Sequence, residues 1–270
     1  MKTTFALAGL ALALCSLCPA QDSSAERLVV PARNSSRPRK VTAHMINGSV
    51  TVKAYAGKEV IVEVGSSPSR SSRGPATVDG MHRLELPPRG LAVEEEDNQI
   101  KVSPGPMLHG PLTITVPVDT SLDLHTSHGE INVEGVHGEV VVDCLNGKAI
   151  LSNVSGNVLA HSLNGAIKVT MDRVDASKPL SFITLNGTID VTLPADYKGN
   201  VKINSSHGAI YTDFDIKIGP GTITQPNTSG EPGKFRVTIG DRGYSGTING
   251  GGAEATFRAL NGPIYIRKKK

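Results

Sequence analysis

The sequence predicts an all-β protein, a single-chain β-solenoid in which each coil of about 18–22 residues carries two short strands. Two observations lead to this prediction. A short word, Asn-Gly or His-Gly followed by alternating apolar residues, recurs along the chain, for example LNGKAIL at 145–151 and LNGTIDV at 185–191. Few segments place apolar residues at the i, i+3, i+4 and i+7 positions of a helix, so we expect helix to be a minor component.

The first 20 residues predict a signal peptide. Lys2 precedes the apolar run 5–17, and Cys18 and Ala20 supply the small residues that a signal peptidase requires. We therefore expect cleavage after Ala20 and export to the periplasm, the cell surface or the medium. The mature chain is expected to have no transmembrane segment, because no other apolar run is long enough to span a bilayer.

The three cysteines allow one alternative to cleavage. Lipid could be attached at Cys15 or Cys18, but Leu14 and Leu17 precede them where a small residue is typical. After cleavage Cys144 alone remains, so no intramolecular disulfide can form although the compartment would permit one. We interpret Cys144 as a packed, inert thiol.

The charge of the chain is nearly balanced. Without Lys2, 27 of the 28 basic residues remain against 25 acidic residues. So small a net charge gives no extended field that would attract a polyanion, and we expect no nucleic-acid partner. The sequence also predicts no cofactor.

Residues 21–40 predict an extended N-terminal segment, and residues 41–270 predict one elongated solenoid domain. Two stretches within this domain, 65–80 and 219–233, are rich in Ser, Pro and Gly and predict flexible loops. Loops of this kind are places where a specific contact can be added to a regular scaffold.

An Asn-Gly or His-Gly pair at the equivalent position of each repeat predicts one corner of each coil. Each turn glycine follows Asn or His, which tolerate a positive φ, and we expect the corners to have this conformation. Apolar residues follow at the second and fourth positions after the glycine, which is the period of a strand with one buried face. The predicted turn residues are Asn47, Gly48, His128, Gly129, Asn146, Gly147, Asn164, Gly165, Asn186, Gly187, His207, Gly208, Asn261 and Gly262.

Separate β-hairpins could also use Asn-Gly turns. Hairpins, however, have no reason to repeat a two-strand cycle in which equivalent positions keep the same residue type. Stacked coils do, because each position then contacts its own copy one coil away. Five of the seven residues before the turn glycine are Asn, which predicts a ladder of side-chain amides along the stack.

The chain resembles the bacterial domain family of unknown function named "putative adhesin", which occurs on exported and envelope proteins. The resemblance covers about residues 40–270. It rests on the signal peptide, the NGxIxV words, the VP at 116–117 before LDLHTSHGEINVEGVHG, and the closing LNGPIYI. This resemblance implies a right-handed, β-helix-like solenoid. Its motifs are structural, so they imply no catalytic residues.

Three side chains are weak candidates for a metal site. His125, Asp143 and His161 each lie four residues before a turn glycine in consecutive coils. Neighbouring strands are about 4.8 Å apart, so the three side chains could line up and hold a transition metal. The alternative, which we favour, is a polar outer face without a metal.

We expect a protein that is not an enzyme. A polysaccharide lyase or hydrolase needs clustered carboxylates and aromatic platforms for sugar rings. Glu130, Asp143 and Asp190 instead fall at different positions of the coil, and the chain has no Trp. The sequence predicts an adhesin-like binding protein of the cell envelope, whose ligand is a cell-surface component, a glycan or an envelope protein. The alternatives are an envelope sensing or assembly module that partners a membrane protein and, third, a carbohydrate-active enzyme.

Overall fold

The computed structural model describes residues 26–31, 37–65, 77–78, 81–82, 91–105, 110–219 and 243–270. The predicted signal peptide and most of the two predicted loops lie outside these residues. Within them every regular element is a strand, and no helix could cross a membrane. The all-β solenoid predicted from the sequence is confirmed.

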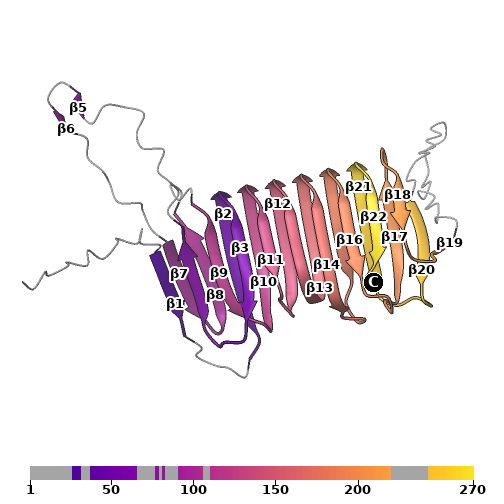
Figure 1. Ribbon diagram of the computed structural model, residues 1–270, viewed down its shortest axis with the longest axis horizontal. Helices are drawn as coiled ribbons and strands as arrows, with labels where there is room; N and C mark the ends of the chain where they lie inside the picture. The colour runs from indigo at the N-terminus through magenta and orange to yellow at the C-terminus, as the bar shows by residue number, and fades with distance from the viewer. Residues whose placement is uncertain are drawn as a thin grey trace, which may run out of the picture.

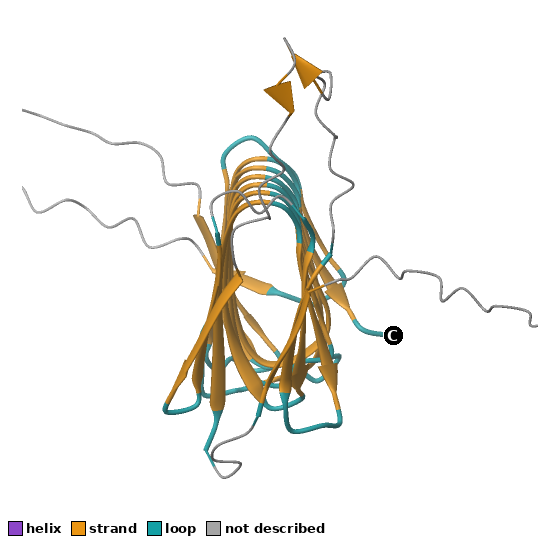
Figure 2. Ribbon diagram, turned by 90° about the vertical axis from the view of Figure 1, so that its left-hand side faces the viewer, coloured by secondary structure: helices purple, strands orange, loops and turns teal. Residues whose placement is uncertain are grey.

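Two long sheets face each other along the molecule, and a regular series of arches joins them at one edge (Figure 2). We call them sheet A and sheet B. Sheet A consists, in spatial order, of β1 (Glu26–Val30), β4 (Val60–Val64), β9 (Leu112–Pro117), β3 (Val50–Tyr55), β11 (Ile131–Glu134), the first half of β13 (Ala149–Asn164), β14 (Ile167–Val174), β16 (Ile189–Leu193), β22 (Ile264–Lys268) and β18 (Ile210–Thr212).

Sheet B contains the strands that lead into the Asn-Gly corners. The strand β13 runs through both sheets, and its second half pairs with sheet-B neighbours on either side. In spatial order sheet B consists of β7 (Leu91–Glu96), β8 (Gln99–Pro104), β2 (Arg39–Asn47), β10 (Thr120–His128), β12 (Glu139–Asn146), the second half of β13, β15 (Leu180–Asn186), β21 (Glu254–Asn261), β17 (Gly199–Ser205), β20 (Gly243–Ile248) and β19 (Lys217–Gly219). Two further strands, β5 (Thr77–Val78) and β6 (Met81–His82), pair only with each other.

The core lies between the two sheets and is continuous along the stack. It forms because alternate residues of each strand are apolar and point inward, as in the buried–intermediate alternation of β12. Parallel pairing then places each inward residue beside its equivalent in the next coil. Phe182 and Phe257, for example, are neighbours on β15 and β21, and their rings stack with centroids 5.2 Å apart.

The coils are not stacked in the order of the sequence. The strands of residues 99–117 lie outside the coil formed by β2 and β3, although they follow it in the chain. The last coil, β21 and β22, is inserted between β15–β16 and β17–β18 (Figure 1). The order of the coils in the stack therefore differs from their order in the sequence at both ends of the molecule.

The two ends of the stack carry antiparallel strands. At one end β4 pairs antiparallel with β9, and β1 pairs antiparallel with β4. The strand β1 lies within the segment 21–40, and its residue Val30 is part of the core. At the other end β20 pairs antiparallel with β17. The outermost described strands are therefore β1 and β18 in sheet A, and β7 and β19 in sheet B.

Candidate binding groove

The Asn-Gly corners bring the backbones of neighbouring coils very close together. The N–H of Gly147 donates to the carbonyl oxygen of Asn164 at 3.1 Å, and the N–H of Gly165 donates to that of Asn186 at 2.9 Å. A Cβ at Gly165 would overlap the carbonyl oxygen of Gly147, and the same overlap recurs from coil to coil. Glycine is needed here because the backbones leave no room for a side chain.

The expected positive φ at every corner is wrong. Three of the seven corner glycines, Gly48, Gly129 and Gly262, do have positive φ, of 138°, 146° and 148°. The other four, which are Gly147, Gly165, Gly187 and Gly208, do not. The Asn or His before the glycine does not have a positive φ either. In six of the seven corners this residue ends a sheet-B strand, as Asn146 ends β12, whereas His207 lies two residues beyond the end of β17. Within the described residues, the non-glycine positions with positive φ are Asp97, Asn98, Asn153 and Asn249.

The Asn side chains of the corners form a ladder. Asn164 donates to the Oδ1 of Asn146 at 2.9 Å, Asn186 donates to Asn164 at 2.8 Å, and Asn261 donates to Asn186 at 2.7 Å. Asn146 in turn contacts Nε2 of His128 at 3.4 Å. The amides are therefore hydrogen-bonded to one another along the stack. In the order of the coils, the column reads Asn47, His128, Asn146, Asn164, Asn186, Asn261 and His207.

A column of apolar side chains lies on the outer face of sheet B, directly before the amide ladder, and it was missed in the sequence analysis. Leu145 is 44% exposed and Leu185 is 38% exposed. The signal was present in the sequence, because these residues are apolar at positions that the strand alternation directs outward. We call this set the leucine column; its members are Ile46, Leu145, Leu163, Leu185 and Leu260.

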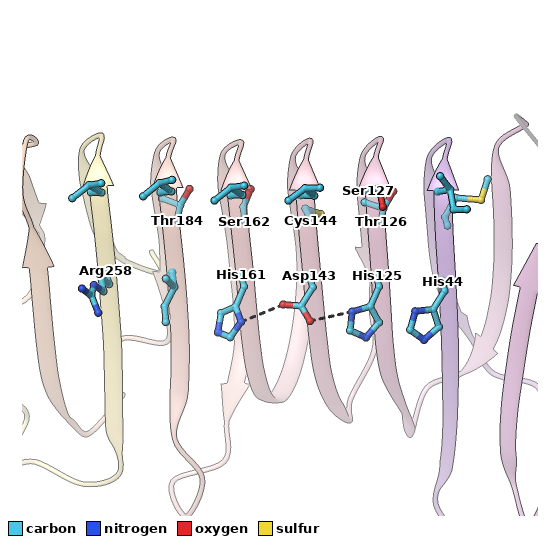
Figure 3. A pocket seen from close by; sticks show the side chains of 17 residues that line it. His44, His125, Thr126, Ser127, Asp143, Cys144, His161, Ser162, Thr184 and Arg258 are labelled. Atoms are coloured by element: carbon cyan, nitrogen blue, oxygen red, sulfur yellow. Dashed lines mark ion pairs between the residues drawn. The ribbon is translucent and has the colours of Figure 1, made fainter. Parts of the chain in front are cut away.

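A second column runs parallel to the first, two residues earlier on each strand (Figure 3). Most of its members are polar, but the strand β15 contributes Ile183. At one end of the column, the rings of His44 and His125 stack with centroids 4.5 Å apart. We call this set the histidine column; it consists of His44, His125, Asp143, His161, Ile183 and Arg258.

The weak metal candidates are brought together as adjacent members of this column. The carboxylate of Asp143 lies between two imidazoles, 3.1 Å from Nδ1 of His125 and 3.2 Å from Nδ1 of His161. Nε2 of His125 is also 2.7 Å from a carboxylate oxygen of Asp123. These groups contact one another directly. Among the residues that the structure describes, no group of three or more His, Cys, Asp or Glu has a geometry that could hold a metal ion.

Two groups beside this cluster have shifted pKa values. Partial burial and the neighbouring His125 lower the pKa of His44, and Lys101 acts in the same direction, whereas Asp123 opposes them. For Asp123, burial acts to raise the pKa, but hydrogen bonds from Lys40 and His125 outweigh it, so that the pKa is lowered. Nζ of Lys40 lies 2.7 Å from the Asp123 carboxylate.

The leucine and histidine columns line an open groove of about 810 Å³ that runs along the stack from β2 to β21. Its volume falls in the range of about 300–1,000 Å³ that is typical of small-molecule sites. The lining is mostly apolar, with Arg258 near one end and the imidazoles near the other. This arrangement can bind an elongated ligand that is largely apolar.

The groove has no activated nucleophile among its lining residues. Cys144 lines it, but burial and the nearby Asp143 raise the pKa of this thiol to about 12. Only the thiolate is an effective nucleophile, so Cys144 is inert at neutral pH. The groove is therefore better suited to binding than to covalent chemistry.

The chain matches one family model and is similar to solved structures. The family model named Toastrack DUF4097 matches residues 35–239. One similar solved structure is a "putative cell adhesion protein" from Clostridium sporogenes ATCC 15579, 13% identical, covering 91% of this chain and 100% of its own, with a TM-score of 0.44. Another is a "putative adhesin" from Bacteroides fragilis NCTC 9343, 11% identical, covering 92% and 98%, with a TM-score of 0.30. No curated protein matches the chain.

Proposed function

The chain belongs to the Toastrack DUF4097 family, and we propose that it is an exported, non-enzymatic, adhesin-like binding protein of the bacterial cell envelope. In this proposal residues 1–20 are a signal peptide, and the mature chain, residues 21–270, presents the outer face of sheet B to its ligand. The ligand is a component of the cell surface or envelope.

The observation that carries this proposal is the groove of sheet B. A surface leucine is ordinary by itself, but four leucines on the consecutive strands β12, β13, β15 and β21, beside a groove of about 810 Å³, make a contiguous apolar feature. Ile46 on β2 belongs to the same column, but Ser127 on β10 separates it from Leu145. Contiguous exposed apolar surface is typical of interaction sites. Because the groove is built on paired strands, its shape is held rigid by the fold, which lowers the entropy cost of binding.

The positions of the carboxylates support a role without catalysis. Asp143 lies on β12 in sheet B, whereas Asp190 lies on β16 in sheet A, so the two project from opposite faces. Asp190 is also held by Arg267, at 2.7 Å. A glycosidase needs its two carboxyl groups on either side of one bond, within about 10 Å of each other. These two aspartates do not meet that requirement.

The test is retention of labelled residues 21–270 on whole cells of the producing organism, on peptidoglycan, and on panels of glycans and matrix proteins. We compare the wild type with Leu163→Asn/Leu185→Asn, which makes the leucine column polar. The matched control is Leu28→Asn, which changes a leucine of similar exposure, 42%, on β1 in sheet A.

We expect saturable retention on one surface, loss of that retention in the groove variant, and no loss in the control. Chelator should have no effect, since the proposal assigns no metal to His125, Asp143 and His161. Equal retention of all three proteins would contradict the assignment of the groove. Binding to one membrane protein alone would favour the alternative of an envelope sensing or assembly module.

A further inference from the structure

Two sets of polar side chains that border the groove are already paired among themselves. On one side, Asn146, Asn164 and Asn186 are linked through their amides. On the other side, the Asp143 carboxylate is shared between His125 and His161. A ligand that relied on hydrogen bonds to these groups would have to compete with contacts along the stack.

The backbone of sheet B offers no hydrogen bonds to the groove either. The strands β12, β13, β15 and β21 pair in parallel in an unbroken series, so their N–H and C=O groups are used within the sheet. A peptide or a glycan lying in the groove would bury polar groups without partners, which is costly. An alkyl chain has no such groups.

The apolar floor of the groove is straight and narrow. Four leucines follow one another on consecutive strands of sheet B, and Ile183 lies beside them. Neighbouring strands are about 4.8 Å apart, so the four span roughly 14 Å. The floor is one side chain wide, which fits a single extended alkyl chain. The four leucines are Leu145, Leu163, Leu185 and Leu260.

One charged side chain at the end of this floor has no counterion among the residues that the structure describes. Arg258 lies on β21, between Ile183 on β15 and Asn204 on β17. Its guanidinium makes no ion pair within the described part of the chain, in contrast with Lys202 and Arg267, which pair with Glu254 and Asp190. Arg258 lines the groove (Figure 3), and Leu260 lies on the same strand, β21.

We propose that the groove binds a single unbranched alkyl chain with an anionic head group, such as a long-chain carboxylate. The chain lies along the leucine column from Leu260 toward Leu145, and the head group pairs with Arg258. This inference rests on the proposed function, because it takes the same groove as the binding surface. It commits to the free amphiphile in water rather than to a lipid within a bilayer.

The probe is dodecanoate below the concentration at which it forms micelles, titrated into residues 21–270 by calorimetry. Hexanoate and dodecyl maltoside are the comparison ligands, because the first lacks most of the alkyl chain and the second lacks the charge. Spectra of leucine-methyl-labelled protein report which leucines are perturbed. The variants are Leu163→Asn and Arg258→Gln, with Leu28→Asn and Lys168→Gln as controls on sheet A.

We expect saturable binding of dodecanoate at one site, with perturbed methyl signals from the leucine column, and no saturable binding of hexanoate. Leu163→Asn should weaken dodecanoate binding by about tenfold, the value of one well-buried apolar contact. Arg258→Gln should weaken dodecanoate binding to a similar degree, so that dodecanoate no longer binds more tightly than dodecyl maltoside. The two controls should bind as the wild type does.

Several outcomes would overturn the proposal. One is that the protein binds dodecanoate no more tightly than hexanoate, and another is that the perturbed methyl signals come from leucines outside the groove. A third is that the protein binds only to vesicles of phosphatidylglycerol. A fourth is that the protein is a dimer that Leu163→Asn dissociates. The result is separable from the cell-retention test. If the groove variant loses cell retention while dodecanoate does not bind, the proposed function stands and the ligand class fails. If dodecanoate binds in the groove but the groove variant is retained on cells like the wild type, the ligand class stands and the proposed function fails.

Discussion

Glycine is required at different residues of this protein for different reasons. At Gly165 a Cβ would overlap the Gly147 carbonyl oxygen, although φ is not positive. At Gly250 φ is 94°, but a methyl group on this residue would meet no other atom within 4 Å. At Gly243 neither condition applies. These three positions therefore separate the cost of close backbone approach from the cost of backbone strain.

We expect Gly165→Ala to lower the free energy of unfolding by on the order of 3 kcal/mol, because two coils must separate to admit the methyl group. Gly250→Ala should cost about 1–2 kcal/mol from the strained φ alone. Gly243→Ala should change stability by less than about 0.5 kcal/mol. Urea denaturation of the three variants measures these differences. A Gly165→Ala protein as stable as Gly243→Ala would contradict the close approach at the corner.

The lowered pKa of His44, which partial burial and the neighbouring His125 cause, predicts that stability depends on pH. Because the pKa of His44 is lowered in the folded state, the unfolded chain takes up this proton at a higher pH than the folded chain does. The free energy of unfolding should therefore fall as the pH is lowered through about 6.5. The lowered pKa of Asp123 acts in a separate window, where stability is lost only as the pH falls below about 4.

We expect His44→Gln to lose less stability than the wild type when the pH is lowered from about 7.5 to about 5. Chemical denaturation at a series of pH values measures this difference. The control is His207→Gln, which changes an exposed histidine outside the groove. If His44→Gln followed the pH dependence of the wild type, the assignment to His44 would fail.

At the scale of the strand and its corner, the repeated word predicted much of what is observed. The Asn column predicted the amide ladder, and the alternation after each glycine predicted the inward residues of sheet A. The leucine column was not predicted, because an apolar residue next to a turn is also compatible with burial. The structure shows that the leucine column and the histidine column line one groove.

The ladder predicts that the loss of an internal Asn side chain lowers the free energy of unfolding more than the loss of a terminal one. Asn164 takes part in two side-chain hydrogen bonds, whereas Asn261 makes one. At about 1 kcal/mol for each bond, Asn164→Ala should destabilise the protein about twice as much as Asn261→Ala. Urea denaturation of the single variants provides the measurement. Equal costs for the two variants would indicate that the amides do not act as a ladder.

At the scale of the whole molecule, the stacking order could not be predicted from the sequence. Every coil carries nearly the same sequence motif, so each coil could pack against any other. The motif therefore does not specify which coil lies next to which in the stack. The structure places β21 and β22 between β15–β16 and β17–β18 (Figure 1). The C-terminal strands are therefore internal to the stack, and the coil that precedes them in the chain is outermost.

This order predicts the effect of shortening the chain. A chain that ends at residue 253 lacks β21 and β22, so β17 keeps only its antiparallel partner β20, and β18 loses the partner it has in sheet A. We expect the amides of residues 199–219 to lose protection from hydrogen exchange, while those of β12 and β13 keep it, because local opening follows the loss of pairing. A chain that begins at residue 37 is the control. Of the described strands it lacks only the edge strand β1, so it should lose protection mainly in β4. Stacking in sequence order would instead leave residues 199–219 paired with β15 and β16, and they would stay protected in the chain that ends at residue 253. Mass-spectrometric hydrogen exchange on the two shortened chains therefore distinguishes an inserted C-terminal coil from one added at the end.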